Sequence, residues 1–130
     1  MRRLIPLALL LMAPMANAQD TDPLAQYVWI SRLVLVFADT PQDPRFVHQL
    51  ELLGADPAAL TERDVVVLID SDPAANGPLR QKLHPRDFML VVIDKDGNLL
   101  FRKPVPWGLR ELTRAIDKTP MRIDEINEKL

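Results

Sequence analysis

The run Leu33-Val-Leu-Val-Phe37 decides how the rest of the chain is interpreted, because it is apolar at every position and has the length of a strand. A strand that is apolar on both faces is typical of a sheet covered on both sides. A second run of this kind stands at Val65-Val-Val-Leu-Ile69, and it is expected to be buried as well. A helix between two such strands favours a right-handed crossover, so the two strands are predicted to run parallel.

The segment between the two runs carries helix signals. Asp43-Pro44 is typical of an N-cap followed by Pro at the first helical position, and Gly54 is expected to end this helix. Asp56-Pro57 repeats the signal for a short helical turn that extends to about Arg63. These signals place the crossover helix where the parallel pair requires it.

The second half of the chain predicts one short helix, two strands joined by a hairpin and one amphipathic helix. These elements are centred on Leu79–Leu83, Phe88–Ile93, Leu99–Arg102 and Leu109–Ile116. Gly97, in the turn Asp94–Asn98, is expected to take a positive φ. The charged tail Thr119–Leu130 is expected to be weakly helical at best. The order β-α-β-α-β-β-α predicts an α/β, thioredoxin-like fold, a four-stranded mixed sheet with helices on both faces.

The first eighteen residues are typical of a signal peptide. Arg2-Arg3 precedes the apolar run Leu4–Met12, and Ala16-Asn-Ala18 fits a cleavage site after Ala18. The prediction is therefore a signal peptide at residues 1–18 and a single domain at residues 19–130, located in the periplasm or secreted. The apolar run is too short to span a bilayer, and no membrane association is expected after cleavage.

Composition excludes several classes of function. The chain contains no Cys, which excludes thiol nucleophiles, disulfides, zinc–thiolate sites and iron–sulfur clusters, and it also fits an oxidising compartment. The 16 basic and 18 acidic residues give a net charge of −2, whereas a nucleic-acid binder needs a basic face. Neither a cofactor nor a nucleic-acid partner is therefore expected.

Several local motifs resemble thioredoxin-like proteins. Val34-Leu-Val-Phe37-Ala38 resembles the strand before their active loop, His84-Pro85 stands about where they usually carry a cis-Pro, and Asp94–Leu99 resembles their hairpin. More narrowly, the chain resembles bacterial domain-of-unknown-function family 4174, which is related to peroxiredoxin-like domains, through the motifs Leu24–Phe37 and Ile116–Arg122. This resemblance implies a fold and an export signal, but no established activity.

The chain departs from redox thioredoxins in the active loop itself. The resemblance places Pro41 and Pro44 near the two cysteine positions of that family. Thiol–disulfide exchange requires a thiolate, which proline cannot supply. Thioredoxin, disulfide isomerase and thiol peroxidase activities are therefore excluded, whatever the fold.

The favoured hypothesis is a binding or interaction module without redox chemistry. Its candidate surface is the loop after the first strand together with the proline before the third strand: Asp39, Pro41, Gln42, Pro44, Arg45 and Pro85. By analogy with the fold's relatives, these residues are expected to converge at one end of the sheet. The partner is expected to be a protein or a small anionic ligand, the latter favoured by helix amides above Pro44.

Two other hypotheses remain open. The first is an enzyme that uses the carboxylates of Asp39, Asp70 or Asp72, with or without a metal ion. A turn stabilised by local hydrogen bonds is the simpler interpretation of Asp70-Ser-Asp72. The second is a purely structural or stress-related accessory protein with no ligand.

Two further groups of residues carry expectations about exposure. Tyr27, Trp29 and Ile30 are expected to pack against the edge of the core, although an exposed recognition stripe is the alternative. The basic cluster Arg80, Lys82 and Arg86 is expected to be a solvated face rather than an anion site.

Overall fold

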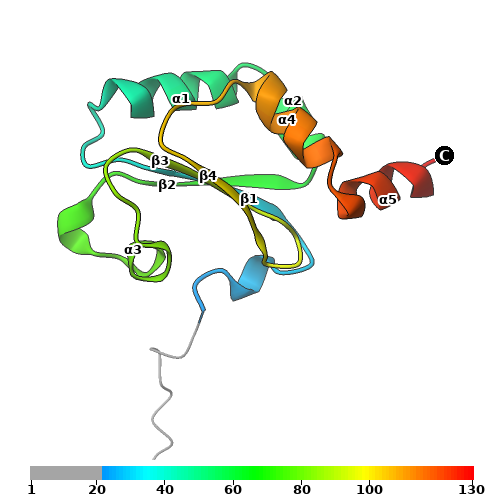
Figure 1. Ribbon diagram of the computed structural model, residues 1–130, viewed down its shortest axis with the longest axis horizontal. Helices are drawn as coiled ribbons and strands as arrows, with labels where there is room; N and C mark the ends of the chain where they lie inside the picture. Colours follow the sequence, from blue (N-terminus) through cyan, green and yellow to red (C-terminus); the bar gives the residue numbers. More distant parts are fainter. Residues whose placement is uncertain (1–21) are drawn as a thin grey trace, which may run out of the picture.

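The computed structural model describes residues 22–130, so the predicted signal peptide at residues 1–18 lies outside the described residues. Figure 1 shows the arrangement of the elements. In chain order they are η2 (Ala25–Tyr27), β1 (Arg32–Phe37), α1 (Pro44–Gly54), α2 (Pro57–Glu62), β2 (Val65–Asp70), η3 (Pro73–Ala75), α3 (Pro78–Leu83), β3 (Met89–Ile93), β4 (Leu99–Lys103), α4 (Leu109–Asp117) and α5 (Pro120–Glu128). None of these helices is long and apolar enough to cross a membrane.

The four strands form one mixed sheet in the order β2-β1-β3-β4. β1 and β2 run parallel, with Arg32 opposite Val65 and Phe37 opposite Asp70. β3 is antiparallel to β1, and β4 is antiparallel to β3. The predicted parallel pair and the hairpin are therefore confirmed, and Gly97 in the hairpin turn has φ 86°.

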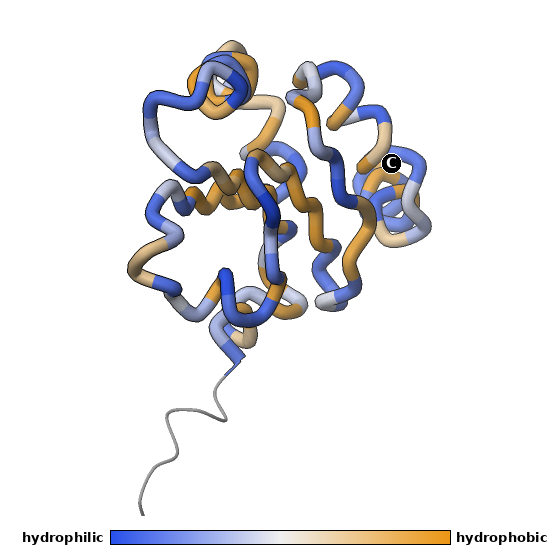
Figure 2. Tube along the Cα trace, turned by 60° about the vertical axis from the view of Figure 1, so that its left-hand side comes forward, coloured by the Kyte–Doolittle hydropathy of each residue, from blue (hydrophilic) through white to orange (hydrophobic). Residues whose placement is uncertain are grey.

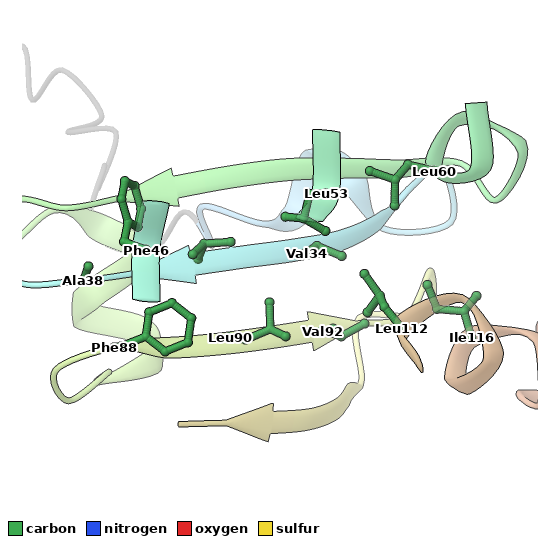
Figure 3. Close-up of a cluster of buried hydrophobic side chains, with 11 residues drawn as sticks. Val34, Ala38, Phe46, Leu53, Leu60, Phe88, Leu90, Val92, Leu112 and Ile116 are labelled. Atoms are coloured by element: carbon green, nitrogen blue, oxygen red, sulfur yellow. The ribbon is translucent and has the colours of Figure 1, made fainter. Parts of the chain in front are cut away.

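The side chains of β1 alternate between two hydrophobic layers, because successive residues of a strand point to opposite faces. Val34 and Val36 pack with residues of α1, α2 and α4, and Figure 3 shows Val34 together with these helices. Leu33, Leu35 and Phe37 pack with residues of η2 and α3 on the other face. The prediction of helices on both faces is thus confirmed, and Figure 2 shows hydrophobic residues concentrated along the central strands.

Two expectations about individual elements were wrong. β2 is only partly buried, and Ile69 is exposed, because β2 is an edge strand with a neighbour on one side only. The tail is not weakly structured: it forms α5, which is N-capped by Thr119 through its hydroxyl and the Arg122 amide. The apolar periodicity of this segment is poor, and charged contacts dock the helix instead.

A fully buried guanidinium holds the amino-terminal end of β1. Arg32 has an exposed fraction of 0%. Its Nε donates to Asp94 at 3.1 Å, its Nη1 donates to the Arg63 carbonyl at 2.9 Å, and both Nη atoms reach the Glu125 carboxylate at 3.0 Å. One side chain therefore ties β1 to the hairpin, to the segment before β2 and to α5.

Glu125 is the acceptor at the centre of this network. Besides Arg32, its carboxylate contacts Lys95 at 2.8 Å and Arg122 at 3.2 Å. Burial alone would raise the pKa of Glu125, but the hydrogen bonds from Arg32 and Lys95 outweigh it and lower the pKa from 4.5 to about 2. The ionised carboxylate is therefore the form that docks α5.

A second buried arginine holds the opposite end of the parallel pair. Arg80 of α3 donates to the Asp70 carboxylate at 2.9 Å and to the Ala38 carbonyl at 2.6 Å. It also lies over the Phe37 ring, at 5.6 Å from the ring centroid. The expectation of a solvated face was therefore wrong for Arg80, because its charge pairs inward with the ends of β1 and β2.

The low pKa of Glu125 predicts how acid destabilises the fold. A carboxylate with a lowered folded-state pKa contributes stability above pH 4.5, and this contribution is lost as the pH falls towards 2. The shift corresponds to about 3 kcal/mol. The free energy of unfolding is measured with urea at pH 7, 5, 4 and 3. The wild type is expected to be more stable than Glu125→Gln, and this difference in the free energy of unfolding should be largest at pH 7 and should decrease as the pH falls. The exposed neighbour variant Asp124→Asn should keep the wild-type profile. A gap that is independent of pH would contradict this assignment.

The substitution Arg80→Met tests whether the contacts of Arg80 with Asp70 and with the Ala38 carbonyl stabilise the fold. The substitution keeps an apolar stem but leaves the Ala38 carbonyl and the Asp70 carboxylate without their charged donor. The free energy of unfolding, measured with urea at pH 7, is expected to fall by about 3 kcal/mol. The control is Lys82→Met on the same helix, whose ion pair with Asp22 is partly exposed and should contribute less than about 1 kcal/mol. If the two variants have the same free energy of unfolding, the buried contacts of Arg80 do not stabilise the fold in this way.

Candidate functional site

The loop between β1 and α1 leaves the carboxyl end of the central strand, where α/β sheets commonly place their sites. Ala38 is buried at the end of the strand, and four consecutive exposed residues follow it. These are Asp39, Thr40, Pro41 and Gln42. The hydroxyl of Thr40 bonds to the side chain of Gln42 at 2.5 Å, so the loop is internally bridged.

Asp43 ends the loop and begins the helix. Its carboxylate accepts the Arg45 amide at 2.9 Å, and Pro44 occupies the first turn, as predicted. Asp43 is buried although its neighbours are exposed. A hydrogen bond from the Arg45 side chain holds the pKa of Asp43 below its usual range, so the cap is ionised.

Arg45 joins this loop to the segment before β3. Its guanidinium donates to Asp43 at 3.1 and 2.8 Å and to Asp87 at 2.7 Å. The same group lies over the Phe88 ring, at 5.7 Å from the ring centroid. These contacts link residues 42 positions apart in the sequence. We refer to Asp43, Arg45 and Asp87 as the Arg45 clamp.

Pro85 lies two residues before the far side of the clamp. It is half-buried, and its peptide bond is trans, as are the others in residues 22–130. His84 and Asp87 on either side have φ 49° and 52°, so the chain turns sharply on both sides of this proline. The structure therefore places the Pro85 segment beside the 39–45 loop, with Arg45 and Asp87 making the contact.

Two of the other candidate carboxylates, Asp70 and Asp72, accept hydrogen bonds within the turn after β2 and from Arg80. Asp70 accepts from Arg80 and from the Asp72 amide at 3.1 Å, and Asp72 accepts the Ala75 amide at 3.4 Å. This is the turn that the sequence predicted. Over residues 22–130, no three His, Asp or Glu side chains are grouped so that they would hold a metal ion.

The amino terminus of α1 already has a negatively charged partner, the side chain of Asp43. The Asp43 carboxylate occupies the helix amides, and the charge of Arg45 is shared between two carboxylates. A further small anion at this end would face both Asp43 and Asp87. The surface that remains free for contact is the exposed part of the loop, Asp39–Gln42.

Gln49, which was not predicted as a functional residue, fixes the other side of α1. Gln49 has an exposed fraction of 0%, and its amide exchanges two hydrogen bonds with the Trp107 backbone, at 2.9 and 2.8 Å. The signal was present, because Gln49 lies three residues after Phe46 and four before Leu53, on the apolar face of the helix. This pair anchors α1 to the segment before α4.

Several solved structures resemble this chain, and two of them are peroxiredoxins. The reduced 2-Cys peroxiredoxin of Plasmodium vivax has a TM-score of 0.59 at 15% sequence identity, over 82% of this chain and 85% of that chain. The mitochondrial 2-Cys peroxiredoxin from Plasmodium falciparum has a TM-score of 0.49 at 18% identity, over 77% and 81%. The first of these likenesses supports the thioredoxin-like fold and nothing more. No curated protein matches the chain.

A family model matches most of the described residues. Its description is "Domain of unknown function (DUF4174)", and it covers residues 23–125. This range includes the four strands, the loop after β1 and the Arg45 clamp. The chain belongs to the DUF4174 family.

Proposed function

We propose that this chain is an exported, periplasmic thioredoxin-like module that binds a partner protein through its 39–45 loop, without thiol chemistry. The absence of Cys supports the second part directly, because no thiolate is available. The observation that carries the first part is the Arg45 clamp, which holds the base of four consecutive exposed residues against the segment before β3.

A loop fixed in this way suits protein binding. Association costs less when the contacting segment is already ordered. Pro41 and Pro44 restrict the backbone, and the Arg45 clamp fixes the base of the loop. On this fixed backbone, the carboxylate of Asp39 can accept hydrogen bonds from a partner, and the side-chain amide of Gln42 can both donate and accept them.

The charges favour a protein over a small anion at this loop. Asp39 is exposed, and the two carboxylates of the clamp lie close by. They would repel an anion while accepting hydrogen bonds from a backbone or from basic side chains. A small anionic ligand is the alternative outcome of the experiment below.

Site-specific photocrosslinking tests this surface in the cell. A benzophenone side chain at Gln42 is expected to form an adduct with one predominant periplasmic protein. The same group at Glu51, an exposed position on α1 away from the loop, should not form that adduct. Absence of any specific adduct at Gln42, or the same adduct from both positions, would contradict the proposal.

The purified partner then allows a binding measurement. The triple variant Asp39→Ala/Gln42→Ala/Arg45→Ala is expected to weaken binding at least about tenfold, because central contacts cost more than 1 kcal/mol when truncated. The control triple variant Glu51→Ala/Asp72→Ala/Asp124→Ala changes exposed residues elsewhere and should bind as wild type. The assignment to a protein partner would be overturned if the loop variant bound the partner as tightly as wild type does. It would also be overturned if the loop bound inorganic phosphate or acetate and not the partner protein.

The alternative of a metal-dependent enzyme predicts that divalent cations stabilise the protein, whereas the proposed binding module predicts no effect. Because Asp70 and Asp72 are engaged by Arg80 and by backbone amides, Mg²⁺, Mn²⁺ and Ca²⁺ are expected to leave the melting temperature unchanged. The measurement is a thermal melt with millimolar cation, with and without EDTA. A stabilisation of several degrees that EDTA reverses would favour the metal-dependent enzyme.

A further inference from the structure

A carboxylate-binding site lies at the amino-terminal end of β1, and a side chain of the protein itself occupies it. The two Nη atoms of Arg32 donate to the two oxygens of the Glu125 carboxylate, each at 3.0 Å, and the ammonium of Lys95 contacts the same carboxylate at 2.8 Å. The paired donors of a guanidinium match the two oxygens of a carboxylate, so this geometry selects that chemical group. The present occupant therefore shows which kind of ligand the site accepts.

The two cations of the site are positioned by groups that do not belong to α5. Arg32 also donates to the Asp94 carboxylate at 3.1 Å and to the Arg63 carbonyl at 2.9 Å. Lys95 also pairs with Asp64 at 2.7 Å. These partners come from the hairpin and from the segment before β2, so Arg32 and Lys95 keep positioning contacts when α5 withdraws.

The helix that covers the site is attached by charges rather than by apolar packing. Of the residues of α5, only Arg122 is buried, whereas Ile123 and Ile126 have exposed fractions of 44% and 37%. In the part of the chain that the structure describes, neither hydrophobic cluster includes a side chain from α5. Figure 1 shows α5 at one end of the sheet rather than over either of its faces. A helix of nine residues attached in this way belongs to the least stable part of a fold.

We propose that α5 is a displaceable cover over this site and that an acidic segment of a partner protein replaces it, with a glutamate or aspartate side chain in the place of Glu125. The partner's carboxylate would form the hydrogen bonds with Arg32 and Lys95 that Glu125 forms when α5 is docked. A ligand that binds only the open form shifts the equilibrium toward that form, so binding and the opening of α5 are coupled.

Exposed apolar side chains beside the site favour a polypeptide over a small carboxylate. The Trp29 amide donates to the Lys95 carbonyl, which places this residue next to the site. The exposed fractions of Trp29 and Ile30 are 70% and 66%. The expectation that these two side chains pack against the core was therefore wrong, and the alternative of an exposed stripe holds for them. A peptide can cover apolar surface of this kind while its carboxylate binds, and a small carboxylate cannot.

The site is independent of the proposed 39–45 surface. Arg32 is the first residue of β1, and Asp39 lies beyond its last residue. Six residues of strand span roughly 20 Å. Binding at the two ends of the sheet is therefore read from different amides, and failure of one proposal leaves the other intact.

A titration of Glu125→Ala tests the class of ligand. This variant of the full chain, labelled with ¹⁵N, keeps both cations but lacks their carboxylate. The capped tripeptide leucine–glutamate–leucine is expected to shift the amides of Arg32 and Lys95 with a dissociation constant on the order of 3 mM. The glutamine analogue should bind at least about tenfold more weakly, because it lacks the charged acceptor. Acetate, the small-carboxylate probe, should bind at least about threefold more weakly than the glutamate peptide.

A second substitution locates the bound carboxylate. In Glu125→Ala/Lys95→Met the glutamate peptide is expected to bind at least about fivefold more weakly than in Glu125→Ala, because one of the two cations is lost. The control is Glu125→Ala/Lys103→Met. Lys103 is paired with Leu90 towards the opposite end of the sheet, so this variant should bind the peptide as Glu125→Ala does.

Hydrogen exchange of the wild type tests whether the ligand displaces α5. A ligand that binds only the open form raises the open population in proportion to the ratio of its concentration to its dissociation constant. About 30 mM glutamate peptide is therefore expected to accelerate exchange of the Ile123–Ile126 amides roughly tenfold, while the β3 amides keep their rates. The glutamine peptide should leave both sets of amides unchanged. This measurement needs no substitution, so it decides the proposal even when Glu125→Ala does not fold.

The results that would overturn the proposal are distinct from one another. The ligand class is wrong if Glu125→Ala binds the glutamate and glutamine peptides equally, or if acetate binds as tightly as the glutamate peptide. The displacement of α5 is wrong if the glutamate peptide leaves the exchange of the wild-type Ile123–Ile126 amides unchanged.

Discussion

The buried guanidinium of Arg32 is the interaction on which the amino-terminal end of the sheet depends. A charge with no exposed surface is tolerated only when each of its donors has a partner, and here those partners come from three separate segments. The position of Arg32 at the first residue of β1 therefore fixes the hairpin, the entry to β2 and α5 together. Arg80 has the same role at the other end, where it bonds to the Ala38 carbonyl and to Asp70.

These arginine networks explain how a Cys-free chain fixes both ends of its sheet. No disulfide is available, and the cross-links between distant segments are ion pairs with buried or partly buried partners. The 39–45 loop adjoins the Arg80 end, and the Trp29 segment adjoins the Arg32 end. The proposed 39–45 contact surface thus begins directly after Ala38, whose carbonyl accepts a hydrogen bond from the buried Arg80, and this favours a binding surface that is ordered before the partner arrives.

Sequence reasoning predicted the elements whose signals are local. Leu33–Phe37 and Val65–Ile69 are strands because they are continuous β-favouring runs, and Asp43-Pro44 and Gly97 sit where cap and turn chemistry require them. The half-exposure of β2 was not predictable, because an apolar run does not reveal whether the strand lies at an edge.

The contacts between charged side chains could not be predicted from local sequence patterns. α5 has weak apolar periodicity and docks through Glu125, whose partner Arg32 lies 93 residues away. The clamp between Arg45 and Asp87 likewise depends on tertiary placement. Charged residues are usually exposed, so nothing in the sequence indicated that Arg32 and Arg80 are buried. For Trp29 the sequence left both burial and an exposed stripe open, and the side chain is exposed. The proximity of the 39–45 loop to the Pro85 segment was expected from the fold that the sequence resembles, but the ion pair between Arg45 and Asp87 was not.

Native-state hydrogen exchange of α5 tests most directly whether Arg32 organises its end of the molecule. A helix of this length is not stable alone in water, so protection of its amides requires docking. In wild type the amides of Ile123–Ile126 are expected to be protected, and in Arg32→Met their protection should fall at least about a hundredfold while β3 amides in the same sample remain protected. Equal protection of α5 in both proteins, or no protection of α5 in wild type, would contradict the account.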